Sequence, residues 1–243
     1  MPGRDSGMMR TGDRVCAIVE AGMLRFEPDG AQQFVGATTQ VDLDCLEEAF
    51  AALPNEQAGI RLRGIEALHS ILSPAGSIGR IAASMLGTTC RPVRALLFDK
   101  TAMTNWSLPW HQDRTIVVTA RREVQGFGPW TVKDGLIHVA PPIEILAGMV
   151  TARFHLDAVP ISNAPLLVAP GSHRFGRIAE SDIADMVARC GIAACLAERG
   201  DVWLYATPIL HASEAAAEPR RRRVLQVDFA TGFLPGGLEW LGV

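Results

Sequence analysis

The chain has 243 residues, of which 48% are hydrophobic and 20% are charged, and its net charge is -3. This length and composition are typical of one globular domain with a full core. The slightly acidic balance argues against binding to nucleic acid or to an anionic membrane, because such binding needs a basic face. The basic run Arg220 to Arg223 is too short to change that expectation.

The sequence also lacks the usual signals for export, membrane insertion and disulfide formation. Residues 1–14 hold scattered charges and no apolar segment of signal-peptide length, and no later run approaches the roughly 18 apolar residues of a membrane span. We therefore expect a cytoplasmic protein. The five cysteines include no CxxC pair, so we expect reduced thiols rather than a disulfide or zinc framework.

The first part of the chain, about residues 1–90, predicts a helical layer. The segment "DLDCLEEAFAALP" (42–54) has an acidic start, apolar residues at helical spacing and a proline stop. The segment "AGSIGRIAASMLG" (75–87) has a similar pattern and ends in glycine. Acidic starts and Gly or Pro stops are typical boundaries of helices.

From about residue 91 to residue 231 the pattern changes to short apolar runs between clusters of Pro, Gly, Asn and Asp. These runs are "VRALLF", "TIVVTA", "MVTARFHL", "PLLVAP", "DVWLYA" and "RVLQVDF", with one helical segment, "ESDIADMVARCG", among them. Such runs are typical of an all-β sandwich or barrel. We therefore predict a mostly β, cupin-like double-stranded β-helix (jelly roll) in a single domain that spans residues 1–243.

One predicted strand has a polar face. In "MVTARFHLDA" the alternate residues Thr151, Arg153, His155 and Asp157 are polar. Alternate side chains leave the same face of a strand, so this face meets either solvent or a wet pocket. We place it inside the barrel.

The segment "NWSLPWHQD" suggests a metal site. His111 and Asp113 are two residues apart, so in an extended segment both side chains share one face. A non-haem Fe(II) site of the facial-triad type needs two imidazoles and one carboxylate, with open positions for a cosubstrate and dioxygen. An HxD pair alone is weak support, because it occurs often by chance.

The second imidazole should come from a distant strand. Among the other histidines, His69 lies in the helical region, His138 in a proline-flanked loop, His155 within a strand and His173 in the turn "APGSH". His211 fits best, because it ends an apolar strand and precedes another strand that begins with arginines.

That arginine run bears on the cosubstrate. A 2-oxoglutarate molecule chelates iron through its 2-oxo-acid end and leaves a distal carboxylate, which a guanidinium neutralises in bidentate fashion. Arg222 shares strand parity with Val224 and Asp228, and Arg223 shares it with Leu225. Parity alone does not choose between the two arginines.

Three segments together resemble the phytanoyl-CoA dioxygenase family of Fe(II)/2-oxoglutarate oxygenases. They are "LLFDKTAMTNWSLPWHQD", "FHLDAVPISNAPLLVAPGSHRFGR" and "HASEAAAEPRRRRVLQVDF", and the resemblance spans roughly residues 92–231. The HQD motif, the PGSH turn and the distal histidine with its downstream arginine follow the order of the family.

The resemblance implies site residues. It makes His111, Asp113 and His211 the iron ligands, which are also the catalytic centre. It selects Arg222, together with Ser213, as the residues that bind 2-oxoglutarate, and it places Arg153 where relatives often have another cosubstrate-lining side chain. One departure from the family lies in the "NAPL" segment, where Ala164 replaces the usual glycine.

The resemblance also implies a reaction. We expect an oxidoreductase that uses Fe(II), 2-oxoglutarate and O2 to hydroxylate, desaturate or cyclise a small organic substrate, with release of succinate and CO2. Halogenation is disfavoured, because halogenating relatives have a small residue where this chain has Asp113. The alternative is a non-oxidative, cupin-like metal-binding or small-molecule-binding protein.

Several neighbouring residues are left with two readings. Lys100 and Asn105 could line the mouth of the pocket, but a surface lysine and a turn asparagine are equally compatible with the sequence. Trp106 and Trp110 favour the core over the substrate wall.

Overall fold

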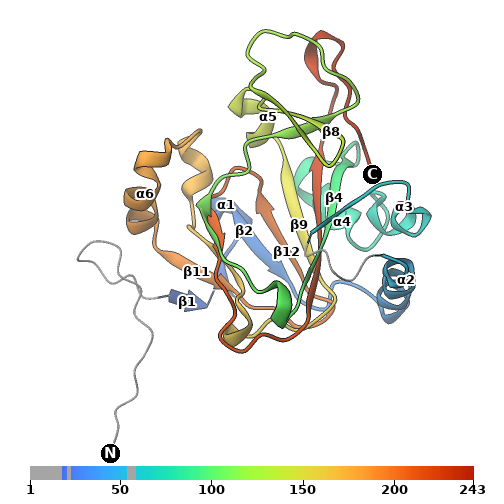
Figure 1. Cartoon of the computed structure of the whole chain (residues 1–243), viewed down its shortest axis with the longest axis vertical. Coiled ribbons are helices and arrows are strands. Elements are labelled where there is room, and N and C mark those ends of the chain that lie inside the picture. Colours follow the sequence, from blue (N-terminus) through green and yellow to red (C-terminus); the bar gives the residue numbers. More distant parts are fainter. Residues whose placement is uncertain (1–17, 21–22, 54–58) are drawn as a thin grey trace, which may run out of the picture.

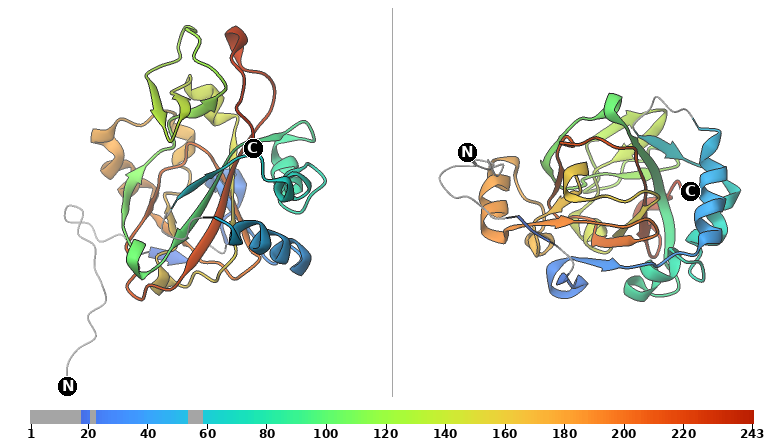
Figure 2. Two further views of the ribbon diagram at one scale, coloured as in Figure 1. Left: turned by 45° about the vertical axis from the view of Figure 1, so that its right-hand side comes forward. Right: turned by 90° about the horizontal axis from the view of Figure 1, so that it is seen from below.

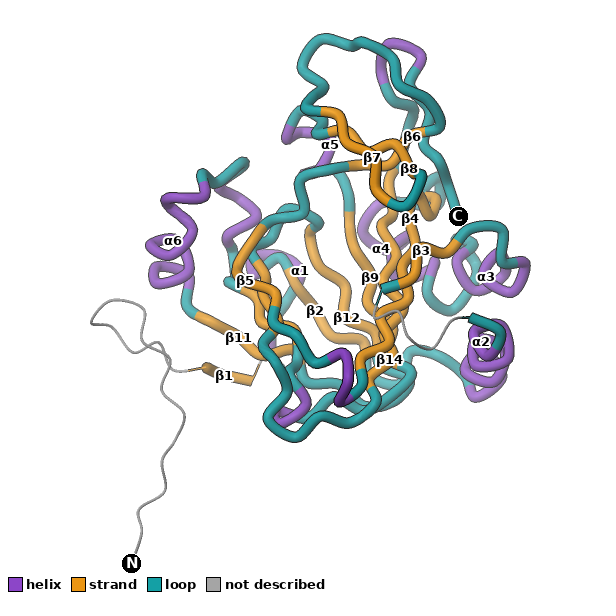
Figure 3. The backbone as a smooth tube through the Cα atoms, in the orientation of Figure 1, coloured by secondary structure: helices purple, strands orange, loops and turns teal. Residues whose placement is uncertain are grey.

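Two β-sheets face one another in the computed structural model and form a jelly-roll barrel (Figure 1, Figure 3). The structure describes residues 18–20, 23–53 and 59–243. The predicted mostly β, jelly-roll fold is therefore confirmed. Within these described residues, no helix has both the length and the apolar character that a membrane crossing requires.

The larger sheet is antiparallel and has the order β2-β12-β9-β14-β4-β3. Its strands span Ala31–Phe34 (β2), Ile60–Leu62 (β3), Arg91–Lys100 (β4), Val150–His155 (β9), Val202–Ala206 (β12) and Arg222–Ala230 (β14). The long β4 and β14 strands pair along almost their whole length, and their partner residues share a face of the sheet.

The smaller sheet has the order β1-β11-β10-β13-β5. Its strands span Ile18–Glu20 (β1), Leu108–His111 (β5), Leu166–Val168 (β10), Ile192–Cys195 (β11) and His211–Ser213 (β13). A third sheet, of order β6-β8-β7, lies above the barrel in Figure 1. It consists of Ile116–Val118 (β6), Trp130–Lys133 (β7) and Leu136–Val139 (β8).

The helices lie outside the barrel. They are α1 (Phe26–Asp29), α2 (Gln40–Ala51), α3 (Glu66–Leu72), α4 (Gly79–Leu86), α5 (Ile143–Ala147) and α6 (Ile183–Cys190), with short 3-10 turns at Ala102–Thr104, Ile161–Asn163, Ser172–Phe175, Glu180–Asp182 and Pro235–Gly237. Figure 2 shows α2 and α6 on opposite sides of the barrel. The start of α2 is closed by a capping box in which Thr39 and Asp42 bond to each other's backbone N–H groups.

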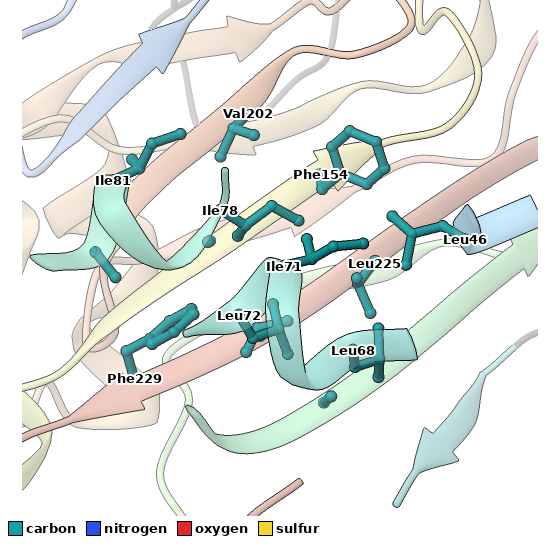
Figure 4. Packing of buried hydrophobic residues seen from close by; sticks show 14 of the residues in the cluster. Leu46, Leu68, Ile71, Leu72, Ile78, Ile81, Phe154, Val202, Leu225 and Phe229 are labelled. Atoms are coloured by element: carbon teal, nitrogen blue, oxygen red, sulfur yellow. The ribbon is translucent and has the colours of Figure 1, made fainter. Parts of the chain in front are cut away.

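The main hydrophobic core fills the space between the helical layer and the larger sheet (Figure 4). Leu46 of α2 and Leu68 of α3 are fully buried there, against sheet residues such as Phe154 and Leu225. The side chains of these sheet residues point outward, toward the helices. The alternate side chains of β9 and β14 therefore point into the barrel. The predicted polar face is accordingly inside for Thr151, Arg153 and His155 of β9, and Thr151 is fully buried there. Asp157, in contrast, lies beyond the end of β9 and forms an ion pair with Arg223 outside the barrel.

Some boundaries differ from the sequence predictions. The first ninety residues also supply strands β1, β2 and β3, because their short extended segments pair with strands from the rest of the chain. The predicted strand "TIVVTA" forms β6, which belongs to the third sheet and not to the barrel. His138 lies in strand β8 and not in a loop, and His211 begins β13 instead of ending a strand.

Candidate metal centre

His111, Asp113 and His211 come together inside the barrel, although the two histidines are far apart in sequence. Strand β13 pairs with β5 so that His211 lies directly opposite His111, and their ring centroids are 4.2 Å apart. Asp113 follows just after the end of β5. One potential ligand atom from each of the three residues lies within 4.8 Å of the others.

Both imidazoles are oriented by their own backbone segments. His111 Nδ1 donates to the carbonyl oxygen of Pro109 at 2.8 Å, and His211 Nδ1 donates to that of Ile209 at 3.0 Å. A carbonyl oxygen can only accept, so each Nδ1 carries the proton and each Nε2 presents a lone pair. Burial lowers the pKa of His211 to about 4, which keeps this imidazole neutral, as a metal ligand must be.

The Asp113 carboxylate completes a donor set of two nitrogens and one oxygen. Its Oδ2 atom is buried and has no hydrogen-bond partner among the described residues. Burial alone would raise the pKa of Asp113, but the charge of the nearby Arg94 guanidinium holds it below its ordinary value. The carboxylate is therefore ionised and has an oxygen to spare, which fits a divalent metal ion.

Arg94 connects this carboxylate to a second acid on the larger sheet. Its Nη2 lies 3.6 Å from Asp113 Oδ1, and its Nε lies 2.6 Å from Asp228 Oδ2. Thr151 Oγ1 donates to Asp228 Oδ1 at 3.0 Å, and it lies 3.1 Å from Thr207 Oγ1. Buried polar groups of the larger sheet therefore fix the orientation of Arg94. Arg94 in turn fixes the orientation of Asp113.

The register of β14 separates the four arginines of the basic run. Arg222 shares its face with Gln226 and Asp228 and points into the barrel, where its Nη1 donates to the Asn163 carbonyl oxygen at 3.3 Å and its Nη2 to Ser213 Oγ at 3.4 Å. Arg223 points to the other side. Arg222 is thus the buried arginine that the family resemblance selects, and Ser213 lies beside it.

Arg221 and Arg223 form ion pairs outside the barrel. Arg221 forms an ion pair with Asp99 at 2.8 Å. Arg223 forms ion pairs with Asp157 at 2.7 Å and with Glu47 at 2.9 Å. The side chain of Arg220 has no ion-pair partner among the described residues, and the residue is exposed.

Arg153 of β9 also points into the barrel. Its Nη1 donates to Gln226 Oε1 at 2.9 Å, and its guanidinium lies 5.3 Å from the centroid of the Phe98 ring. The Tyr205 hydroxyl donates to the same Gln226 oxygen at 3.4 Å. The Tyr205 ring in turn lies 5.7 Å from the His211 ring, which links Arg153 to the histidine cluster.

The residues for which the sequence allowed two interpretations take different positions in the structure. Lys100 is buried opposite Arg222, and its Nζ donates to the Trp106 carbonyl oxygen at 2.8 Å. Asn105 joins its loop to Ala216 by two hydrogen bonds, so it ties the segment before β5 to the segment after β13. Trp110 packs on the outer face of the smaller sheet and under α6, so it belongs to the core. Trp106, in contrast, is exposed, so its prediction as a core residue is wrong; its ring centroid lies 4.6 Å from Lys100 Nζ.

The backbone conformation at residue 164 explains why the family usually has glycine at this position. Its φ of +51° lies in the left-handed region that favours glycine. The usual glycine of the "NGPL" segment would adopt this conformation without strain. Ala164 keeps the same turn, which presents the preceding carbonyl of Asn163 to Arg222.

The sequence reasoning missed Arg94, Tyr205, Gln226 and Asp228 as parts of the site. The available signal was a polar residue at an inward position of an otherwise apolar strand, as Arg94 is in "VRALLF" and Gln226 is in "RVLQVDF". Only the pairing of β4 with β14 shows that these positions share the barrel interior.

A cavity of about 460 Å³ lies beside the metal centre. Its walls come from β3 and β4, from the third sheet and from the C-terminal segment, and they include Arg61, Arg63, Arg94, Val117, Asp134 and Leu241. Arg94 thus contacts the Asp113 carboxylate and also lines this cavity. The three candidate ligands do not line it, so the cavity is next to the metal centre and not around it.

A jelly-roll barrel that holds a partly buried His-Asp-His group defines the class of non-haem metal proteins with a facial triad. The sequence model of the family described as phytanoyl-CoA dioxygenase (PhyH) matches residues 24–224. The chain therefore belongs to the phytanoyl-CoA dioxygenase family.

Solved structures show the same fold at low sequence identity. EctD from S. alaskensis, crystallised with 2-oxoglutarate and 5-hydroxyectoine, aligns with a TM-score of 0.64 and 20% identity over 90% of this chain and 77% of that chain. The epimerase SnoN, in complex with Fe3+, alpha ketoglutarate and nogalamycin RO, gives a TM-score of 0.61 and 16% identity over 88% of both chains. HygX from Streptomyces hygroscopicus, with iron bound, gives 0.61 and 13% over 90% and 89%. No curated protein sequence matches the chain significantly.

Proposed function

We propose that this protein is an Fe(II)- and 2-oxoglutarate-dependent dioxygenase of the hydroxylase type. Family membership and the structural neighbours support an oxygenase activity that depends on iron and 2-oxoglutarate. The observation that carries the proposal is the convergence of His111, Asp113 and His211, with both Nε2 lone pairs and the Asp113 Oδ2 atom free of hydrogen-bond partners among the described residues.

In this proposal the three residues are the iron ligands. His111 and His211 would bind through Nε2, because their Nδ1 protons are held by backbone carbonyls. Asp113 would bind through Oδ2 and also offset part of the charge of the ion. When bound, the iron would supply the reaction of O2 with 2-oxoglutarate that yields succinate, CO2 and an oxidant able to attack a C–H bond.

Arg222 and Ser213 would bind the distal carboxylate of 2-oxoglutarate. The Arg222 guanidinium is buried, lacks an acidic partner among the described residues and lies next to the Ser213 hydroxyl. A planar guanidinium with a neighbouring hydroxyl offers a carboxylate several donors at once. This pair would hold the cosubstrate in one orientation relative to the metal.

Hydroxylation, or an allied desaturation or cyclisation, is the reaction type that the ligand set favours. Asp113 occupies the position that halogenating relatives leave open for a halide. The substrate would be a small organic molecule, because similar solved structures contain small molecules, 5-hydroxyectoine in EctD and nogalamycin RO in SnoN.

The test combines metal content with turnover. Wild-type protein should bind one Fe(II) per chain and form succinate from 2-oxoglutarate under air. His111→Ala and His211→Ala should lose both properties, since two ligands cannot hold the ion in facial geometry. His69→Ala, which changes an exposed histidine of α3, should keep both.

Two results would contradict the proposal. Wild-type iron content and turnover in either ligand variant would mean that the ligands are wrongly assigned. Iron binding without any succinate formation would instead favour the non-oxidative, cupin-like metal-binding protein.

A further inference from the structure

The barrel interior contains more positive charge than the proposed cofactors can neutralise. Arg153, Lys100 and Arg222 point inward from the neighbouring strands β9, β4 and β14. None of the ion pairs formed by the described residues includes any of them. Their hydrogen-bond acceptors are the neutral oxygens of Gln226, Trp106, Asn163 and Ser213.

The three cations are close enough to influence one another. Burial lowers the pKa of Lys100 to about 8, and the charges of Arg222 and Arg153 add to this effect. Burial and the charge of Arg153 likewise lower the pKa of Arg222 to about 10. Like charges that are buried together are unfavourable unless anions bind between them. Such a cluster is therefore a receptor for anions.

The charges of the loaded site can be compared directly. Arg94 and Asp228 neutralise each other, and Fe(II) with Asp113 leaves a single positive charge. The two carboxylates of 2-oxoglutarate would balance this charge and that of Arg222. The charge of Arg153, and that of Lys100 below its pKa, would then remain without a counterion.

Of these two residues, Arg153 is better placed to meet a substrate. It lies opposite Gln226, which is four residues or about 13 Å along β14 from Arg222, toward the metal centre. Its side chain is only half-buried, and its Nε is buried without a hydrogen-bond partner among the described residues. Lys100, in contrast, is already bonded to the loop at Trp106.

We propose that the substrate carries an anionic group, a carboxylate or a phosphate, and that Arg153 binds this group inside the barrel. The inference rests on the proposed function, because it assigns Arg222 to 2-oxoglutarate and leaves Arg153 for the substrate. A neutral substrate would leave this half-buried guanidinium without a counterion. Arg153 thereby sets the chemical class of the substrate.

The experiment measures anion binding to the loaded protein. Protein saturated anaerobically with Fe(II) and 2-oxoglutarate is titrated calorimetrically with acetate, with inorganic phosphate and with neutral acetamide, all at one ionic strength. Wild type should bind acetate or phosphate and not acetamide, and the better of the two anions identifies the substrate group. Arg153→Gln should weaken this binding by about 30-fold or more, as truncation of one partner of a buried charge pair does.

The controls separate the possible failures. Arg220→Gln removes an exposed charge from the same region and should bind the anion like wild type. Arg153→Gln should bind 2-oxoglutarate with nearly wild-type affinity. Absence of anion binding in wild type, equal binding of acetamide, or equal anion binding by Arg153→Gln would overturn the inference.

Two further results have separate meanings. A loss of 2-oxoglutarate affinity in Arg153→Gln, with anion binding intact, would assign Arg153 to the cosubstrate and also overturn the inference. Failure of wild type to bind 2-oxoglutarate at all would instead refute the proposed function. The comparison of anions with acetamide uses only wild-type protein, so the test stands even if Arg153→Gln does not fold.

Discussion

Arg94 lies between two carboxylates, and one of them is the proposed iron ligand Asp113. Replacement of Arg94 by Gln would remove the positive charge that holds Asp113 ionised and oriented. We expect Arg94→Gln to lower the Fe(II) affinity by about 10-fold to 100-fold, as loss of a group that orients a metal ligand usually does. Titration with Fe(II) under anaerobic conditions measures this effect.

Arg61→Gln is the matched control for Arg94. Arg61 lines the same cavity and forms an ion pair with Asp134, but it forms no ion pair or hydrogen bond with Asp113 among the described residues. The Arg61→Gln variant should bind Fe(II) with the affinity of the wild-type protein. Equal Fe(II) affinities in Arg94→Gln and wild type would mean that Asp113 is held by its own backbone alone.

Arg222 gives a prediction for the cosubstrate. Arg222→Ala should raise the KM for 2-oxoglutarate by about two orders of magnitude or more, because breaking a buried charge pair costs about 3 to 5 kcal/mol. Arg220→Ala, which removes an exposed arginine from the same run, should change the KM little. Similar effects of both substitutions in steady-state kinetics would show that the run acts as a general basic patch.

At the scale of elements, the helical layer should stabilise the fold without touching the chemistry. Leu68 of α3 is fully buried against the larger sheet. Leu68→Ala should lower the free energy of unfolding by about 2 to 5 kcal/mol through lost burial and a residual cavity. Val41→Ala, at an exposed position of α2, should cost little.

Urea denaturation gives these free energies, and Fe(II) titration of the folded variants gives the second readout. Since Leu68 faces away from the barrel interior, its replacement should leave the Fe(II) affinity unchanged. A variant that is destabilised and also binds Fe(II) poorly would show that the helical layer and the metal centre are coupled.

Strand periodicity explains which elements the sequence could predict. The alternation in "MVTARFHL" is strong enough to predict β9 and its polar face, and the family resemblance selects Arg222 within the basic run. Parity could not separate Arg222 from Arg223, because both alternating sets of β14 contain buried residues. The choice depends on the register with β4 and β9, which is a long-range property.

The same limit accounts for His138. Its short strand β8 is bounded by turns and pairs with β6 and β7 only in the folded molecule, so its proline-flanked segment has the sequence signature of a loop. Arg94 was missed because a single charge in an apolar strand indicates an unusual position without naming the partner across the barrel.

At the scale of the whole molecule, buried neutral histidines predict a loss of stability in acid. Burial lowers the pKa of His155 from 6.5 to about 3, with smaller contributions from Arg153 and Arg222. As the pH falls below about 6.5, the unfolded chain takes up a proton that the folded chain takes up only near pH 3. This histidine therefore lowers the stability of the fold between those values, by at most about 1.4 kcal/mol per pH unit.

His138 should act in the same direction, because burial lowers its pKa to about 4. Urea denaturation between pH 7 and pH 4 measures the slope of stability against pH. His155→Gln should make this slope smaller, whereas His69→Gln, at an exposed position of α3, should leave it unchanged. An unaltered slope in His155→Gln would exclude His155 as a source of the acid sensitivity.

The position of the two ligand histidines has a mechanical consequence. Among the strands of the described residues, β5 lies at the edge of the smaller sheet and pairs only with β13. Edge strands are the parts of a sheet that fray first when few bonds hold them. An ion bound by His111 and Asp113, at the end of β5, and by His211 of β13 would hold these two strands together. Loss of the metal would then allow β5 to separate from β13 more easily. Separation of β5 from β13 would, in turn, release the metal.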